Sequence, residues 1–224
     1  SYEDTYPAIK KALSVCGGKH SMFMTKSKSQ DTTESYDEVL PTVSLDGDIA
    51  IIKLPDFLVT AEDFLGTAEA GQKYAKVAED FIHENRDKIK GVVLDLRGNI
   101  GGDMGPMATA VSSLLPDGEL VYYHYRSYDI PVTLKNGVVS NAGTGGKSLY
   151  PEEKLNVPVA ILTDDMTASS GEALTLCFRG LENTRTFGAP TAGYTSVNML
   201  YNMYDGAQMY LTVAFDKART GEIF

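Results

Sequence analysis

The segment TASSGE, residues 167–172, places two serines where a run of strand-forming residues gives way to an apolar helical pattern. A serine at the start of a helix is well placed to act as a nucleophile, because free N–H groups and the helix dipole stabilise negative charge there. Ser169 and Glu172 also form the S-x-x-E pattern of a capping box, which only satisfies backbone donors. Both interpretations use the same geometry, so neither excludes the other.

A serine nucleophile needs a base within hydrogen-bond reach, and the chain offers three histidines. His83 lies off the apolar stripe of an expected helix and is interpreted as a solvated surface residue. His124, in YYHYRS, is either structural or lines a cleft. His20, in GGKHSMFM, follows two glycines and precedes an apolar run. A histidine at that position could lie at the mouth of a cleft, and it could equally be an ordinary core or surface residue.

A second junction of interest is LDLRGNIGGDM, residues 94–104, at the end of an expected strand. Three glycines within five residues allow a sharp turn that exposes backbone N–H groups. Such donors can form an oxyanion hole, although a glycine-rich turn without function has the same composition. The P-loop and dinucleotide fingerprints are both excluded, because no Gly-Lys-Ser/Thr follows and the glycine spacing differs.

The elements that must position these residues alternate between helix and strand, which predicts an α/β core with a largely parallel sheet. Helices are expected at residues 6–16, 69–89, 104–115 and 170–181, and strands at 43–55 (two, with a turn at Asp46-Gly47), 91–96, 157–163, 184–188 and 209–217. Residues 120–139 alternate and contain the turn signal Asn136-Gly137, so an antiparallel hairpin is expected to stand off as a small cap at about 119–150. Residues 25–38 are polar and are interpreted as a mobile loop or linker.

The composition is that of a soluble globular protein, with 43% hydrophobic and 22% charged residues. A formal net charge of −10 disfavours nucleic acid and mildly favours cationic partners, although solubility alone accounts for it. No apolar run is long enough to span a membrane. The chain begins without Met or a signal peptide, so a trimmed or mature fragment is expected, and any membrane anchor would precede it. Cys16 and Cys177 make no disulfide framework or metal site and are each expected to be small buried residues; no cofactor is implied.

Taken together, GGKHS, VVLDLRGNIGG, TASSGE and FGAPTAGYTSVN resemble the tail-specific, or C-terminal processing, family of serine peptidases. Order and spacing fit from about residue 17 to the end of the chain. The three family elements are matched by Asp95, Leu96, Arg97, Asn99, Gly101 and Gly102, then by Ser169, Gly171 and Glu172, and then by Gly188, Pro190, Thr191 and Gly193. The resemblance implies a crotonase- or ClpP-like spiral core with a mostly parallel sheet and flanking helices.

The resemblance also implies a reaction, the cleavage of peptides near their C-terminus by acyl transfer. Ser169 would be the nucleophile, and the oxyanion donors would be the amide of Ser170 and an amide of the Gly101-Gly102 pair, which sequence does not separate. A peptide-binding relative that has lost turnover is the alternative. An acyl-CoA enzyme of the crotonase type is disfavoured, because no basic phosphate site is present.

One departure from the family pattern concerns the base. The lysine-dependent branch carries its general base where this chain has Tyr194, and a glutamine where it has Asn198. Tyrosine, with a reference pKa near 10, is a poor base at neutral pH. His20 is followed by Ser21, as in the histidine-using, tricorn-like branch, which implies His20 as the base. The supporting residues would be Ser21, Tyr194, Asn198 and Glu172, with Glu222 a weak match for the glutamate of that branch.

A second departure is the lack of room for a PDZ domain, since only about 75 residues separate His20 from Asp95. The expected organisation is an N-terminal helical segment at 1–24 that carries the base and a protease core at 25–224. Within the family this layout is most similar to the nisin resistance proteins, extracellular, membrane-anchored bacterial peptidases that cleave a cationic lanthionine peptide. The resemblance therefore implies an extracellular or cell-surface location and a peptide or protein substrate, with a cationic peptide as one candidate.

Overall fold

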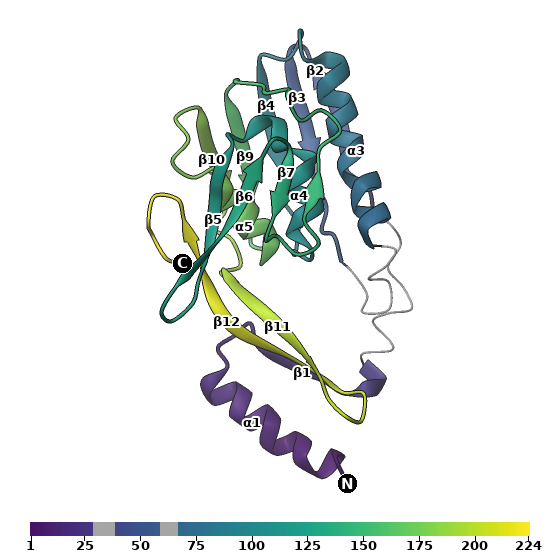
Figure 1. Cartoon of the computed structure of the whole chain (residues 1–224), viewed down its shortest axis with the longest axis vertical. Helices are drawn as coiled ribbons and strands as arrows, with labels where there is room; N and C mark the ends of the chain where they lie inside the picture. The colour runs from purple at the N-terminus through teal and green to yellow at the C-terminus, as the bar shows by residue number, and fades with distance from the viewer. Residues whose placement is uncertain (29–38, 59–66) are drawn as a thin grey trace.

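The computed structural model describes residues 1–28, 39–58 and 67–224. Two β-sheets with helices between and beside them form the body of the molecule (Figure 1). The smaller sheet has five strands in the order β10-β9-β4-β3-β2 and is parallel except for the pair β2–β3. Its strands are β2 (Thr42–Asp46), β3 (Ile49–Lys53), β4 (Gly91–Asp95), β9 (Val159–Thr163) and β10 (Thr184–Gly188).

The five-stranded sheet forms where the sequence predicts it. Four of the five residues of β4 are buried, as expected for a parallel strand covered on both faces. The strand–turn–strand expected at 43–55 is confirmed, with β2 and β3 joined through Gly47 at φ 62°. Because β4 and β9 are adjacent and parallel, the loops that follow them meet at one edge of the sheet. Those loops carry the glycine-rich turn and the TASSGE segment.

The larger sheet has seven strands, and all of its pairs are antiparallel. Its strands are β1 (Met22–Met24), β5 (Gly118–His124), β6 (Asp129–Lys135), β7 (Val138–Ser140), β8 (Gly146–Lys147), β11 (Ser196–Asn202) and β12 (Gln208–Ala218). The expectation of a largely parallel sheet is correct for the smaller sheet and wrong for this one. Alternation predicts strands, but which strands share a sheet depends on long-range pairing.

Residues 119–150, expected to form a hairpin cap, supply β5 to β8 of the antiparallel sheet. The predicted turn at Asn136-Gly137 joins β6 to β7, and both residues have positive φ, 49° and 72°. Inward-facing side chains of β5, β6 and β7 belong to the same buried cluster as those of β3, β4 and β9. This segment is therefore continuous with the main hydrophobic core.

The helices fill the space between the sheets and flank them (Figure 1). They are η1 (Glu3–Thr5), α1 (Tyr6–Cys16), α3 (Thr67–Asn85), α4 (Met104–Ala110), η2 (Ser112–Leu114) and α5 (Ser170–Cys177). All seven residues of α4 are buried, which places this helix inside the core. α5 is shorter than predicted, and a guanidinium N–H of Arg219 donates to the carbonyl of Cys177 where it ends (2.5 Å).

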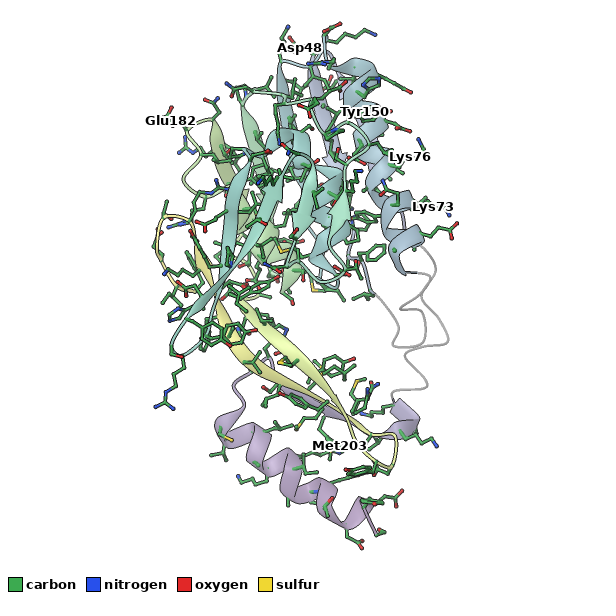
Figure 2. The ribbon with its side chains drawn as sticks, viewed as in Figure 1. Asp48, Lys73, Lys76, Tyr150, Glu182 and Met203 are labelled. Atoms are coloured by element: carbon green, nitrogen blue, oxygen red, sulfur yellow. The ribbon has the colours of Figure 1, made fainter. Side chains whose placement is uncertain are left out.

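The N-terminal segment joins the rest of the chain through the long hairpin of β11 and β12. β1 pairs with β12, Met22 lying opposite Tyr210, so α1, β1 and the far part of the hairpin extend away from the core (Figure 1). Figure 2 shows Met203 at the tip of this hairpin. Leu13 is the one buried residue of α1. For Cys16 the expected burial is wrong, because α1 packs on one side only and leaves this thiol exposed, whereas Cys177 is buried.

Part of the predicted loop at 25–38, residues 29–38, lies outside the described residues. In the described ranges, no helix combines the length and the apolar composition that crossing a bilayer requires.

Candidate active site

The turn that carries the first serine is held in an unusual backbone conformation. Ser169 immediately precedes α5 and has φ 52° and ψ −120°, a region that non-glycine residues rarely adopt. Such a conformation costs about 1–3 kcal/mol and persists only where the surroundings enforce it. The amide of Ala168 donates to the carbonyl of Asn99 (2.9 Å), and the Thr167 hydroxyl donates to the carbonyl of Leu96 (2.9 Å). The serine turn is thus fixed to the end of β4.

Glu172 is the second element that fixes this turn. Its side chain is 2% exposed, and one carboxylate oxygen accepts the amides of Ser169 (2.9 Å) and Tyr194 (2.7 Å). The other oxygen accepts the Thr191 hydroxyl (2.5 Å) and the Gly193 amide (2.8 Å). The predicted capping role of Glu172 is therefore one part of a wider role, because the same carboxylate binds the segment 189–195, called here the Tyr194 loop.

The glycine-rich turn lies directly against the serine turn. A Cβ added to Gly101 would stand 2.8 Å from Cβ of Ser169 and 3.0 Å from the amide nitrogen of Ser170. The Ser170 hydroxyl donates to the carbonyl of Gly102 (2.5 Å). Gly101 and Gly102 have φ of 109° and 101°, so glycine is required at both positions. The two junctions noted in the sequence therefore form one site.

Asn99 organises the glycine-rich turn from inside the core, where it is fully buried. Its side-chain oxygen accepts the Gly101 amide (2.9 Å), and its amide group donates to the carbonyls of Leu54 (3.0 Å) and Pro55 (3.1 Å). The amide of Gly101 is therefore already engaged. Among the described residues, the amides of Gly102 and Ser170 have no acceptor.

His20 lies in the loop between α1 and β1 and reaches the site from the other side. Its Nδ1 is 2.8 Å from the hydroxyl oxygen of Ser196 on β11, and its ring meets the ring of Tyr194 edge-on at 5.1 Å between centroids. Burial lowers the pKa of the His20 imidazole below its usual value. The charge of Glu172 and the backbone of Ser196 act in the opposite direction, and the charge of Lys19 lowers the pKa further.

No hydrogen bond joins His20 to Ser169 in the described part of the chain. The two residues are connected through shared neighbours instead, since the Tyr194 loop packs on His20 and is bound by the same carboxylate as the serine turn. Lys19 adds a further connection, because its ammonium donates to the carbonyl of Ala192 (2.7 Å) and lies 4.7 Å from the centre of the Tyr194 ring.

The expected supporting residues take different places. Asn198 donates to the backbone carbonyl of His20 (2.9 Å). Among the described residues, the Ser21 hydroxyl makes no hydrogen bond to the imidazole; it donates to the carbonyl of Gly17 and accepts the amide of Thr212 (2.9 Å). Glu222, the weak match near the C-terminus, binds Arg179 (2.8 Å) and not the histidine.

Two residues of the site were not found from the sequence. Ser196 stands two positions before Asn198, and that spacing places both side chains on one face of a strand. A bulge between Val197 and Asn198 disturbs this register, so spacing alone is a weak signal. Lys19 directly precedes His20, and no sequence motif marks it as part of the site.

The other two histidines bind carboxylates away from this site. His83 Nδ1 lies 2.9 Å from Glu153, and its ring stacks on Tyr150 with the centroids 4.0 Å apart. His124 Nδ1 lies 2.6 Å from Asp129, which also binds Lys217 (2.7 Å). Within the described ranges, no group of three or more histidine, cysteine or carboxylate side chains is arranged to hold a metal ion.

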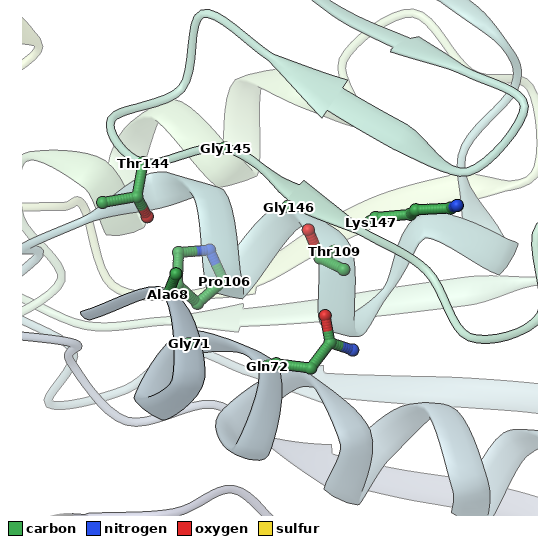
Figure 3. A pocket seen from close by; sticks show the side chains of 9 residues that line it. All are labelled: Ala68, Gly71, Gln72, Pro106, Thr109, Thr144, Gly145, Gly146 and Lys147. Atoms are coloured by element: carbon green, nitrogen blue, oxygen red, sulfur yellow. The ribbon is translucent and has the colours of Figure 1, made fainter. Parts of the chain in front are cut away.

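A cavity of about 320 Å³ lies between α3, α4 and the segment 144–147 (Figure 3). Gln72 points toward Thr109 there, and its amide nitrogen is buried with no partner among the described residues. The lining includes no residue of the serine turn, the glycine-rich turn or the Tyr194 loop. This cavity is therefore separate from the site formed around Ser169.

The comparison with known proteins identifies the family. The sequence profile of Peptidase family S41 matches residues 48–222, which include both the glycine-rich turn and the serine turn. The chain belongs to this family. It is a serine-type peptidase, and the resemblance noted in the sequence is confirmed.

Three relatives indicate where the chain stands within the family. It is 36% identical to the nisin-resistance protein of Lactococcus lactis subsp. lactis over 225 residues, covering all of this chain and 68% of that protein. It matches the solved structure of a lipoprotein from Streptococcus agalactiae at 31% identity and a TM-score of 0.77, covering 100% of this chain and 74% of the other. It is 30% identical to the carboxy-terminal processing protease CtpA of Bacillus subtilis (strain 168) over 141 residues, which is 62% of this chain and 28% of that protein.

Proposed function

We propose that the protein cleaves peptides near their C-terminus by acyl transfer, with Ser169 as nucleophile and His20 as general base. The observation that carries this proposal is the contact between the glycine-rich turn and the serine turn. Among the described residues of these two turns, the amides of Gly102 and Ser170 have no acceptor, and Ser169 itself lies in a strained turn. That combination is the requirement for stabilising a tetrahedral oxyanion.

In the proposed first step, the Ser169 hydroxyl oxygen attacks the scissile carbonyl and passes its proton to Nε2 of His20. The amides of Ser170 and Gly102 would hold the oxygen that becomes negative. Gly102 is favoured over Gly101, because the Gly101 amide already donates to Asn99 (2.9 Å). His20 then protonates the leaving amine, and a water deprotonated by the same histidine hydrolyses the acyl-enzyme.

The electrostatics of the base suit this mechanism. Burial holds the pKa of His20 below its usual value, so the imidazole is neutral at pH 7 and has a lone pair available. Nδ1 is occupied by Ser196, which leaves Nε2 as the nitrogen that can face a substrate. The lack of a direct bond between His20 and Ser169 fits an unliganded site, where catalytic hydrogen bonds are commonly long and shorten on binding.

For substrate and location, we draw on the relatives and on charge. A net charge of −10 favours a cationic peptide, and one relative is a nisin-resistance protein. Another is a carboxy-terminal processing protease, which supports cleavage near a C-terminus. The match to a streptococcal lipoprotein supports a cell-surface location. We also propose that the core has the crotonase- or ClpP-like spiral topology and that the base comes from a separate N-terminal segment at 1–24.

The alternative is a peptide-binding relative without turnover, which the missing hydrogen bond between His20 and Ser169 would favour. Labelling with a fluorophosphonate probe separates the two. We expect wild type to be labelled and Ser169→Ala to be unlabelled, while Ser170→Ala, which keeps its amide, remains reactive. Equal labelling of wild type and Ser169→Ala would show that the nucleophile is another residue.

The base and the substrate class need separate tests. We expect His20→Ala to label at least about 100-fold more slowly than His124→Ala, its matched control, as is typical for loss of a general base. Mass spectrometry of a panel of cationic and acidic peptides of equal length, with nisin included, should show C-terminal fragments released from cationic members. Intact peptides throughout would support the binding protein instead.

A further inference from the structure

The three histidines of this protein differ in what orients their rings. His83 and His124 each present Nδ1 to a carboxylate, at 2.9 Å and 2.6 Å. His20 presents Nδ1 to the hydroxyl of Ser196 at 2.8 Å, and in the described part of the chain no carboxylate makes a hydrogen bond to its ring. The histidine at the serine site is therefore the one whose partner is neutral.

Ser196 is itself rigidly placed. Its amide donates to the carbonyl of Tyr194 (2.8 Å), and it pairs with Phe215 in the β11–β12 register. The same strand also binds the backbone of the histidine, because Asn198 donates to the carbonyl of His20 (2.9 Å). Asn198 is in turn fixed by the Thr212 hydroxyl (2.9 Å). Ring and backbone of His20 are thus held by one strand.

We propose that Ser196 is the positioning residue of the base: its hydroxyl accepts the Nδ1–H of His20 and so keeps the lone pair of the neutral ring on Nε2. The proposal rests on the proposed function, in which His20 takes the proton of Ser169. The hydrogen bond from Nδ1–H to Ser196 also fixes the rotation of the ring. The edge-on contact with Tyr194 limits that rotation from another side.

The choice of a hydroxyl has an electrostatic consequence. A carboxylate on Nδ1 would stabilise the imidazolium and raise the pKa of the base, whereas a hydroxyl orients the ring with a smaller effect on its charge state. The charged groups that act on His20 are Glu172 of α5, which raises its pKa, and Lys19 of its own loop, which lowers it. With burial acting as the largest influence, the ring stays neutral at pH 7.

The test measures the rate constant of fluorophosphonate labelling from pH 5 to pH 9. We expect Ser196→Ala to label about 10-fold more slowly, the effect of losing one hydrogen bond worth about 1.4 kcal/mol. The acidic limb of its pH–rate profile should move to lower pH, because loss of the hydroxyl removes an acceptor that stabilises the imidazolium. Ser196→Thr keeps a hydroxyl and should recover most of the rate. Ser196→Asp should move the acidic limb to higher pH. Ser140→Ala, an exposed serine of β7, is the matched control.

Opposite shifts of the acidic limb in the alanine and aspartate variants, with rescue by threonine, would establish the role. A Ser196→Ala protein with the wild-type rate and midpoint would overturn it. So would a slow Ser196→Ala protein with an unmoved midpoint and a lowered melting temperature, since that pattern means a structural role alone. If His20→Ala labels as fast as wild type while Ser169→Ala is unlabelled, the base assignment fails, which is a different result.

Discussion

The two halves of the proposed catalytic site are held by different amounts of structure. On the serine side, Ser169 follows β9 of the five-stranded sheet. Hydrogen bonds that involve the buried residues Asn99, Thr167 and Glu172 fix its turn. On the base side, His20 sits on a loop whose contacts run through the β11–β12 hairpin and the Lys19 ammonium. In Figure 1 this side belongs to the part that extends away from the core.

The difference follows from what each half must do. A nucleophile and its oxyanion donors must keep fixed distances, and in the proposed site buried groups hold the two turns that carry them. The proposed base, His20, comes from the opposite end of the sequence and is held by a few hydrogen bonds to one hairpin. The serine side should therefore lose stability when it is altered, whereas the base side should lose rate.

The largest effect is expected at Glu172, where the two sides are joined. Glu172→Gln keeps the volume but presents an NH₂ group to two of the four donors that the carboxylate now accepts. We expect the free energy of unfolding to fall by about 3 kcal/mol, as for a buried charged acceptor that is lost. The acidic limb of the pH–rate profile for labelling should also move to lower pH, because Glu172 raises the pKa of His20.

Urea denaturation and the pH dependence of labelling measure both effects. Glu182→Gln, in the exposed loop between α5 and β10 (Figure 2), is the matched control. An unfolding free energy like that of the control would mean that the carboxylate does not hold the two sides together.

A second prediction concerns Asp216 on β12, at the base of the hairpin. This residue is buried, with 2% of its surface exposed. Burial and the nearby charge of Glu172 raise the pKa of Asp216 to about 7, above the 3.8 of an exposed aspartate. The protonated form is favoured in the folded state, so this contribution to stability is full below pH 3.8 and is lost as the pH rises to about 7.

We expect Asp216→Asn to remove this slope, the fall in the free energy of unfolding as the pH rises. The variant should be more stable than wild type at pH 8 by roughly 3 kcal/mol and about equal at pH 3.5, by urea denaturation at both values. Asp165→Asn, which removes an exposed carboxylate, should leave the slope unchanged. A slope in Asp216→Asn as steep as in wild type would place its origin in another group.

A smaller effect is expected from the strained serine. Ser169→Gly and Ser169→Ala both remove the hydroxyl, but only glycine adopts φ 52° without strain. We expect the glycine variant to be more stable than the alanine variant by about 1 kcal/mol in urea denaturation. An alanine variant of equal or greater stability would show that the turn stores no strain.

The smallest effect is expected at Lys19, on the base side. Lys19→Ala should slow labelling by about 2- to 3-fold and leave stability within about 0.5 kcal/mol, as is usual for exposed charged contacts. The acidic limb should move to higher pH, because the Lys19 charge lowers the pKa of His20. Lys11→Ala on α1, also exposed, is the matched control. A loss of stability without a change in rate would contradict the division between the two sides.

Much of the serine side could be predicted from the sequence because its signals are local. The glycines at 101 and 102, the serine pair and Glu172 lie in two short segments after strands of recognisable pattern. Parallel neighbours bring such segments to one sheet edge, so their meeting follows from the strand assignments. The antiparallel sheet could not be predicted in this way. Its strands come from both ends of the chain, and β1 joins it through pairing with β12.

By itself the sequence determined the serine turn, the glycine-rich turn and the departure at Tyr194 that points to His20, because each depends on residue type and on a few neighbours. Only the tertiary structure decided that Ser196, rather than Ser21, contacts the imidazole and that Glu172 binds the Tyr194 loop as well as its own helix. Those contacts join segments as many as 176 positions apart. Their geometry is set by the twist and register of the β11–β12 hairpin, which no local pattern encodes.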